Sequence, residues 1–103
     1  MSGPLRPLGG LNEPGVPAAE GRLRDLGVEP YAWSNAPGDR YAAHEHAFTK
    51  LLVCAEGSIT FLVGETAEPV ELAAGEGFEL PARTRHAAVV GPDGCTCLEG
   101  HRA

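Results

Sequence analysis

From residue 28 onward, apolar and polar positions form short segments of the kind that build β-sheets. Runs rich in Val, Ile, Leu, Tyr and Phe are interrupted every few residues by Gly, Pro, Asn or Asp. Such runs are typical of strands and such interruptions of turns, so the pattern predicts an all-β sandwich or barrel. Turns are expected at Glu56-Gly57 and across residues 91–94, among other places. The predicted strands cover residues 28–34, 40–46, 48–55, 58–64, 68–72, 77–80, 85–91 and 95–100.

The first 27 residues have a different pattern. Residues 1–17 contain four prolines and several glycines, which predicts an extended arm that is either loose or lies over a neighbouring surface. A short helix is expected over residues 18–26, with Leu23 and Leu26 on one face and Gly27 as its end. The expected organisation is an arm and helix over 1–27 and a barrel over 28–103.

Composition narrows the range of partners. The chain has 103 residues and a net charge of −6, so it has room for one small core. Its negative charge argues against binding to nucleic acid or anionic membranes. No apolar run approaches the roughly 20 residues of a membrane span, and the N-terminus has no apolar stretch of signal-peptide length.

The cysteines indicate a reducing environment. Cys54, Cys95 and Cys97 are odd in number, and two of them are separated by one residue. A disulfide framework is therefore not expected, and we interpret the three as small buried strand residues. Together with the absence of a leader, this predicts a cytoplasmic protein.

Three histidines form the strongest chemical signal. His44 and His46 are two residues apart, and His86 lies in another predicted strand. In a strand, residues i and i+2 point to the same face with side chains roughly 7 Å apart, so two imidazoles can converge on one ion. Three histidines would leave coordination positions open, which is typical of catalytic metal sites, and would suit Zn, Fe, Mn, Ni or Cu. The alternative is three hydrogen-bonded or surface histidines without a metal.

The spacing around the first two histidines resembles the first motif of the cupins, G-x5-H-x-H-x3–4-E-x6-G. Gly38, His44, His46 and Gly57 fall at the motif positions, but Lys50 stands where the family has glutamate. The resemblance implies that His44 and His46 face inward as metal ligands. It also implies that one carboxylate ligand is missing.

The second cupin motif, G-x5-P-x-G-x2-H-x3-N, is also similar to this sequence. Gly75, Pro81 and His86 match it, whereas Arg83 and Val90 replace its second glycine and its asparagine. The short spacing between the two motifs is similar to that of small single-domain bacterial cupins. The resemblance covers roughly residues 28–100 and implies a double-stranded β-helix, or jelly-roll barrel, with His86 as the third ligand. It implies little about chemistry, because one fold hosts many functions.

Lys50 is the only lysine of the chain, and two interpretations of it stay open. A solvated surface lysine is the simpler one. If Lys50 faces inward, a carboxylate such as Glu99 or Glu56 must balance its charge beside a divalent cation. It could then act on a substrate as an acid, a base or an anion clamp, which makes it the candidate catalytic residue.

Other side chains are candidates for contact with a substrate. Arg83 and Arg85 flank the third histidine and could hold an anion, although solvated loop arginines are equally compatible with the sequence. Tyr41 follows the Pro-Gly turn and is a further candidate. Tyr31 and Trp33 share a strand face, for which a core or subunit-interface role is favoured over a place at a pocket mouth. Among the remaining residues, Phe48, Phe61 and Phe78 are expected to fill the barrel and His101 to lie on the surface without a partner.

Three functions are compatible with these observations. The first is a small metalloenzyme acting on a small polar or anionic substrate. The second is a non-catalytic, sensor-like module that binds a small molecule with or without metal. The third is a structural barrel in which Lys50 takes the place of the metal. Because barrel edge strands can pair with a second copy and the cupins that this sequence resembles are commonly dimeric, we also expect a homodimer.

Overall fold

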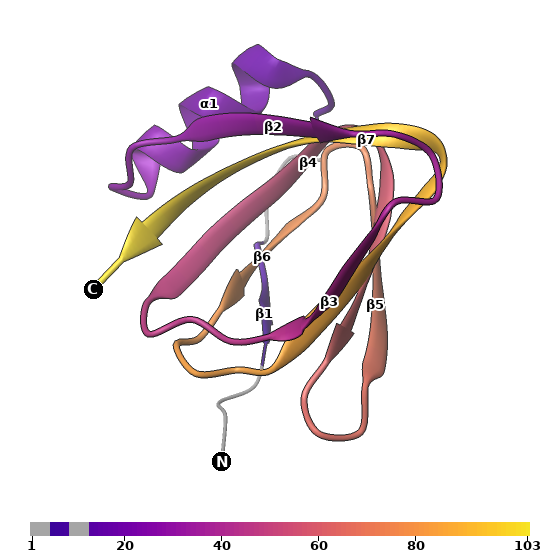
Figure 1. Cartoon of the computed structure of the whole chain (residues 1–103). Helices are drawn as coiled ribbons and strands as arrows, with labels where there is room; N and C mark the ends of the chain where they lie inside the picture. The colour runs from indigo at the N-terminus through magenta and orange to yellow at the C-terminus, as the bar shows by residue number, and fades with distance from the viewer. Residues whose placement is uncertain (1–4, 9–12) are drawn as a thin grey trace.

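The computed structural model describes residues 5–8 and 13–103, which form a β-barrel with one helix outside it (Figure 1). All strand pairs are antiparallel in this part of the chain. The predicted all-β jelly-roll architecture is therefore confirmed. The elements are β1 (Arg6–Pro7), α1 (Val16–Asp25), β2 (Tyr31–Asn35), β3 (Arg40–His44), β4 (Thr49–Val63), β5 (Glu68–Ala73), β6 (Gly77–Leu80) and β7 (His86–Arg102).

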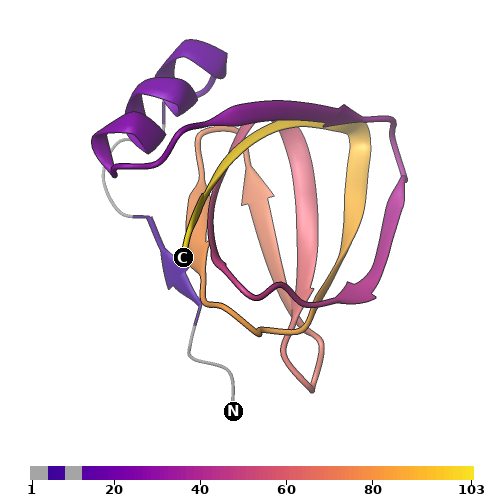
Figure 2. The ribbon, with the colours of Figure 1, turned by 60° about the vertical axis from the view of Figure 1, so that its left-hand side comes forward.

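Two long strands, β4 and β7, run through the single curved sheet that forms the barrel, and every other strand except β1 pairs with one of them. The first half of β4 pairs with β6 and its second half with β5, while β7 pairs with β4 along nearly its entire length. β2 and β3 pair with successive stretches of β7. The view in Figure 2 looks into the resulting barrel, with the helix outside the wall.

The sequence analysis divided each long strand in two, and this was wrong. The predicted breaks at Glu56-Gly57 and residues 91–94 are irregularities inside continuous strands, where the β4–β7 register shifts. At this point Gly57 (φ +74°) lies against Gly94 (φ +76°), and a Cβ on Gly57 would lie 2.0 Å from the Gly94 carbonyl oxygen. Glycine supplies both the backbone conformation and the close approach, so the turn-like residues bend the strands without ending them.

The sheet separates two apolar clusters. Inside the barrel, Leu52 and Cys54 of β4 pack with residues such as Phe61 and Phe78. On the outer face, Leu51, Val53 and Ala55 of the same strand pack against Ala19 and Leu23 of α1. β4 is therefore apolar on both faces where the helix covers it, as expected for a strand buried on both sides.

The N-terminal residues that the structure describes are attached to the barrel. Arg6 and Pro7 pair with Glu79 and Phe78 of β6, and the Leu8 N–H donates to the Gly77 carbonyl at 2.9 Å. The expected arm thus lies over a neighbouring surface in residues 5–8, while residues 1–4 and 9–12 of it lie outside the described part. Among the described residues, no helix is long and apolar enough to cross a bilayer.

Candidate functional site

Three histidine side chains converge inside the barrel. His44 ends β3, His86 begins β7 directly opposite it, and His46 lies in the segment that leads to β4. One ring nitrogen of each lies within 4.8 Å of the others, and the ring centroids are 4.4–5.3 Å apart. The prediction that one strand carries both His44 and His46 was wrong, because β3 ends at His44. The chain leaves the strand after His44, and the ring centroids of His44 and His46 lie 4.8 Å apart.

Backbone contacts set the orientation of two of the imidazoles. The Nδ1 of His44 lies 2.7 Å from the Ala42 carbonyl, and that of His86 lies 2.9 Å from the Thr84 carbonyl. A carbonyl only accepts hydrogen bonds, so each Nδ1 carries the proton and each Nε2 presents a lone pair. Metal-binding histidines commonly donate one ring N–H to a backbone carbonyl in this way, which leaves the other ring nitrogen free to bind the metal.

Two of the remaining ring nitrogens have no hydrogen-bond partner in the described part of the chain. Among the described residues, the Nε2 atoms of His46 and His86 are buried and accept or donate no hydrogen bond. Burial, together with the charge of Lys50 and the neighbouring histidines, lowers the pKa of His86 to about 4. Burial and the Lys50 charge also lower the pKa of His46. Both rings are therefore neutral near pH 7, and neutral imidazole is the form that binds a metal. The donor set fits a divalent transition metal.

Lys50 faces the same interior. It is 8% exposed, and its Nζ lies 3.4 Å from Oε1 of Glu99. Of the two interpretations left open by the sequence, the structure supports the inward one with Glu99 as partner. Glu56, the other candidate carboxylate, is exposed. The reason is strand direction: Lys50 pairs with His101 and Leu52 pairs with Glu99 across β4 and β7, so Lys50 and Glu99 are diagonal neighbours on one face.

Glu99 is the centre of a buried polar network. The Tyr31 hydroxyl donates to Oε2 at 2.7 Å, the Trp33 indole to Oε1 at 2.8 Å, and the His101 imidazole to Oε2 at 2.6 Å. Burial alone would raise the pKa of Glu99, but the hydrogen bonds from His101 and Tyr31 and the Lys50 charge outweigh it, so the pKa is lowered. The carboxylate is thus held ionised.

His101 corrects the sequence analysis. It was expected to be a surface residue without a partner, yet its imidazole bonds Glu99 and stacks on Phe48 with ring centroids 4.0 Å apart. The side chain stays one-third exposed. The Glu-x-His spacing of Glu99 and His101 could have indicated this, because both residues then point to the face on which Tyr31 pairs with Glu99.

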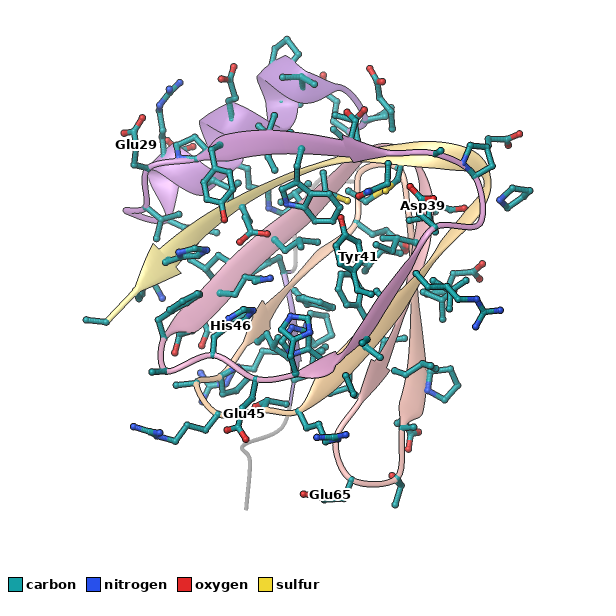
Figure 3. All side chains as sticks on the ribbon, in the orientation of Figure 1. Glu29, Asp39, Tyr41, Glu45, His46 and Glu65 are labelled. Atoms are coloured by element: carbon teal, nitrogen blue, oxygen red, sulfur yellow. The ribbon has the colours of Figure 1, made fainter. Side chains whose placement is uncertain are left out.

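These groups surround a cavity of about 250 Å³. Tyr31 and Trp33, for which a core or interface role was favoured, lie at this cavity. Figure 3 shows Tyr41 and His46 pointing into the barrel and Glu45 pointing away from it. Beside the three histidines and the charged network, the lining consists mainly of aromatic rings, namely Tyr31, Trp33, Tyr41, Phe48 and Phe61.

The structure does not bring Arg83 and Arg85 to this cavity. Both side chains are exposed, and neither lines the cavity. Arg85 precedes the inward-pointing His86, so strand alternation directs it outward. Arg83 lies in a turn at φ +62°, where its backbone N–H donates to the His46 carbonyl at 2.7 Å. Its backbone therefore supports a site histidine, while its side chain points elsewhere.

Comparisons with known proteins identify the fold. No family model matches the sequence, and a search of curated proteins finds no match. Among solved structures, a chain from the crystal structures of the DMSP lyases RdDddP and RnDddQII is 27% identical over 72% of this chain, with a TM-score of 0.61. An RmlC-like cupin from Shewanella frigidimarina NCIMB 400 is 22% identical over 72%, with a TM-score of 0.63. KdgF from a Halomonas species is 22% identical over 72%, with a TM-score of 0.59.

The lengths of these proteins differ from that of this chain. The match covers 36% of the DMSP lyase chain, 64% of the RmlC-like cupin and 68% of KdgF. This chain therefore spans about a third of the first of these structures and about two thirds of the other two.

Proposed function

We propose that this chain, which is a small cupin-superfamily domain, holds a divalent transition metal on His44, His46 and His86 and acts as a metalloenzyme. Its substrate would be a small polar or anionic molecule that enters the adjacent cavity. The observation that carries the proposal is the convergence of three histidine nitrogens, two of them unpartnered in a buried site. A buried polar atom without a partner is costly, and a bound metal would remove that cost.

The residues present define what such a site could do. A bound metal would act as a Lewis acid on a substrate oxygen or would lower the pKa of a bound water. Three protein ligands leave room for that oxygen. The aromatic lining would exclude bulk water and hold the body of the substrate. Lys50, the candidate catalytic residue, lines the same cavity and could donate a proton to a substrate there.

The metal could be Zn, Fe, Mn, Ni or Cu, because imidazole ligands suit all of them. Loading with each ion in turn, followed by elemental analysis, would identify those that bind with one-to-one stoichiometry. Similarity to the DMSP lyases supports enzymatic turnover over a sensor-like module. An oxygen-uptake, lyase and isomerase screen on the loaded protein would separate the two.

The test of the site uses four histidine variants. His44→Ala, His46→Ala and His86→Ala should each remove most of the bound metal. His101→Ala is the matched control, because this histidine lines the same cavity but belongs to the Glu99 network. Retention of the wild-type metal content by the first three variants would exclude the site, as would a wild-type protein that cannot be loaded.

We also propose a homodimer. Tyr31 and Tyr41 are 50% and 38% exposed, and large exposed aromatics are common at interfaces. β2 is an edge strand of the sheet, and edges are places where copies can pair. A monomeric mass in light scattering at micromolar concentration would contradict this.

A cytoplasmic location and a small-molecule ligand complete the proposal. Cys54, Cys95 and Cys97 are free and buried, which fits a reducing compartment. The net charge of −6 supports the expectation that neither nucleic acid nor an anionic membrane is a partner. At low salt, we expect the protein to bind neither a DNA column nor anionic vesicles.

A further inference from the structure

We propose that Lys50 is the anion-binding group of the cavity and that the ligand of this protein carries a carboxylate, held between the histidine site and the Lys50 ammonium. The inference rests on the proposed function for its metal end only. The lysine end stands on contacts within the chain.

The first argument is the unused hydrogen-bonding capacity of Lys50. An ammonium has three N–H donors, and within residues 5–8 and 13–103 the Glu99 carboxylate is its one partner. That contact is 3.4 Å long, whereas the three other donors to Glu99 lie at 2.6–2.8 Å. The carboxylate is therefore satisfied mainly by Tyr31, Trp33 and His101. Lys50 therefore keeps uncommitted donors, and it lines the cavity.

The second argument is charge. Neutral histidines leave a bound divalent ion with its full charge, and position 50 adds a positive group where the cupin motif has a negative one. Glu99 offsets one positive charge and is already saturated with donors. Beside the metal, the cavity has no further carboxylate among its lining residues. A desolvated positive site of this kind favours an anion, and a carboxylate can bridge the two positive groups with its two oxygens.

The third argument is size and surface. A cavity of about 250 Å³ holds the volume of roughly eight water molecules. The ligand is therefore small, on the order of ten non-hydrogen atoms. The rings of Trp33, Phe48 and Phe61 offer flat apolar contacts to the part of the ligand that carries no charge. A compact carboxylate with a short apolar or aromatic body fits these constraints.

Glu99 serves as a positioning residue in this arrangement. Glu99 is 4% exposed, and three hydrogen bonds fix its carboxylate, which contacts the Lys50 ammonium. A rigid carboxylate can hold the ammonium in one place while leaving its other donors for a ligand. The arrangement thus gives a buried lysine a fixed counterion and leaves its side chain at the cavity.

The experiment is a calorimetric titration of benzoate, acetate and uncharged benzamide into zinc-loaded and metal-free protein. Benzoate should bind the loaded wild type at least tenfold more tightly than benzamide. Lys50→Met should weaken benzoate binding by at least tenfold in the loaded protein and leave benzamide unchanged. Lys50→Arg should retain most of the benzoate affinity. Arg85→Met is the matched control, because it removes a positive charge next to His86 but outside the cavity.

The outcomes separate the two proposals. If neither zinc nor any of the other four candidate ions binds, the proposed function fails, and the metal-free titration alone judges the lysine. Binding of benzoate that Lys50→Met abolishes then supports the inference, and no binding of benzoate contradicts it. If zinc binds but neither carboxylate does, the inference is wrong. It is equally wrong if Lys50→Met binds benzoate as the wild type does, or if Arg85→Met weakens it as much as Lys50→Met.

Discussion

Lys50 and Glu99 form a buried pair in which the two members are unequally supported. The Lys50 Nζ lies 3.4 Å from Glu99 Oε1, and Glu99 in addition accepts hydrogen bonds from Tyr31, Trp33 and His101. Loss of the lysine leaves a carboxylate with three donors. Loss of the carboxylate charge leaves an ammonium without a counterion.

This asymmetry predicts unequal effects on stability. Glu99→Gln should lower the free energy of unfolding of the metal-free protein by about 3–5 kcal/mol, the usual cost of an uncompensated buried charge. Lys50→Met should cost about 1 kcal/mol, because the hydrogen bonds to Glu99 remain. Urea unfolding of the two variants measures the difference. Equal destabilisation would contradict the inferred hierarchy of partners.

Glu99 also predicts a dependence of stability on pH. Its pKa in the fold lies below the ordinary value of 4.5, so the unfolded chain binds a proton more readily than the folded protein. Stability from this group is therefore complete above about pH 4.5 and decreases as the pH falls through the lowered pKa. Urea unfolding of the metal-free protein between pH 3 and 6 measures it. Glu99→Gln should show a shallower decline, and an identical profile would refute the prediction.

Lys50→Glu should strengthen metal binding. It places an anionic oxygen in the cavity where the cupin motif carries its carboxylate, which adds an attractive charge and one more ligand. We expect an increase in affinity of at least tenfold in a competitive zinc titration. Lys50→Met should give a smaller increase, since it only removes repulsion. A Lys50→Glu affinity no higher than that of Lys50→Met would show that position 50 does not reach the metal.

Gly57 predicts a strong backbone effect at the bend of the barrel. Gly57→Ala should cost about 3 kcal/mol or more, because its φ of +74° strains an L-residue and the new Cβ would meet the Gly94 carbonyl at 2.0 Å. Gly21→Ala is the control, since within the described residues a Cβ there would meet no atom within 4 Å beyond its chain neighbours and the helix's own backbone. That variant should be stabilised by about 0.5–1 kcal/mol. Thermal unfolding of both decides the prediction.

Local pattern predicted the all-β fold, and the motif spacing predicted that the three histidines face its interior. The histidine spacing indicated the cluster. Lys50 stands where the cupin motif has glutamate, and its charge led us to predict a carboxylate partner, with Glu99 as one of two candidates. Two kinds of information were missing. Gly57 and Gly94 look like turn residues in isolation, and only their mutual contact shows that the strands continue. The Glu-x-His spacing places His101 and Glu99 on one strand face, but only the pairing of β7 with β2 and β4 shows that this face points inward.

Arg83 and Arg85 show the opposite error, in which the sequence places residues at the site that the structure does not bring there. Proximity to His86 in the sequence suggested proximity to the site, but side chains of adjacent strand residues point in opposite directions. Only the alternation around His86, once its inward direction is known, excludes Arg85. Arg83 stands where the cupin motif has a glycine, and it adopts a left-handed backbone conformation. The residue type alone gives no indication of that conformation or of the outward direction of the side chain.

The two-sided burial of β4 has a practical consequence for anyone who shortens this protein. Leu51, Val53 and Ala55 form an apolar surface that α1 covers, although the helix precedes the barrel in the chain. A version trimmed to begin at residue 28 would keep all three candidate metal ligands yet expose that surface to water. Such a trimmed protein would tend to self-associate. A smaller protein built around the candidate metal site would therefore need either the helix or polar residues on the outer face of β4.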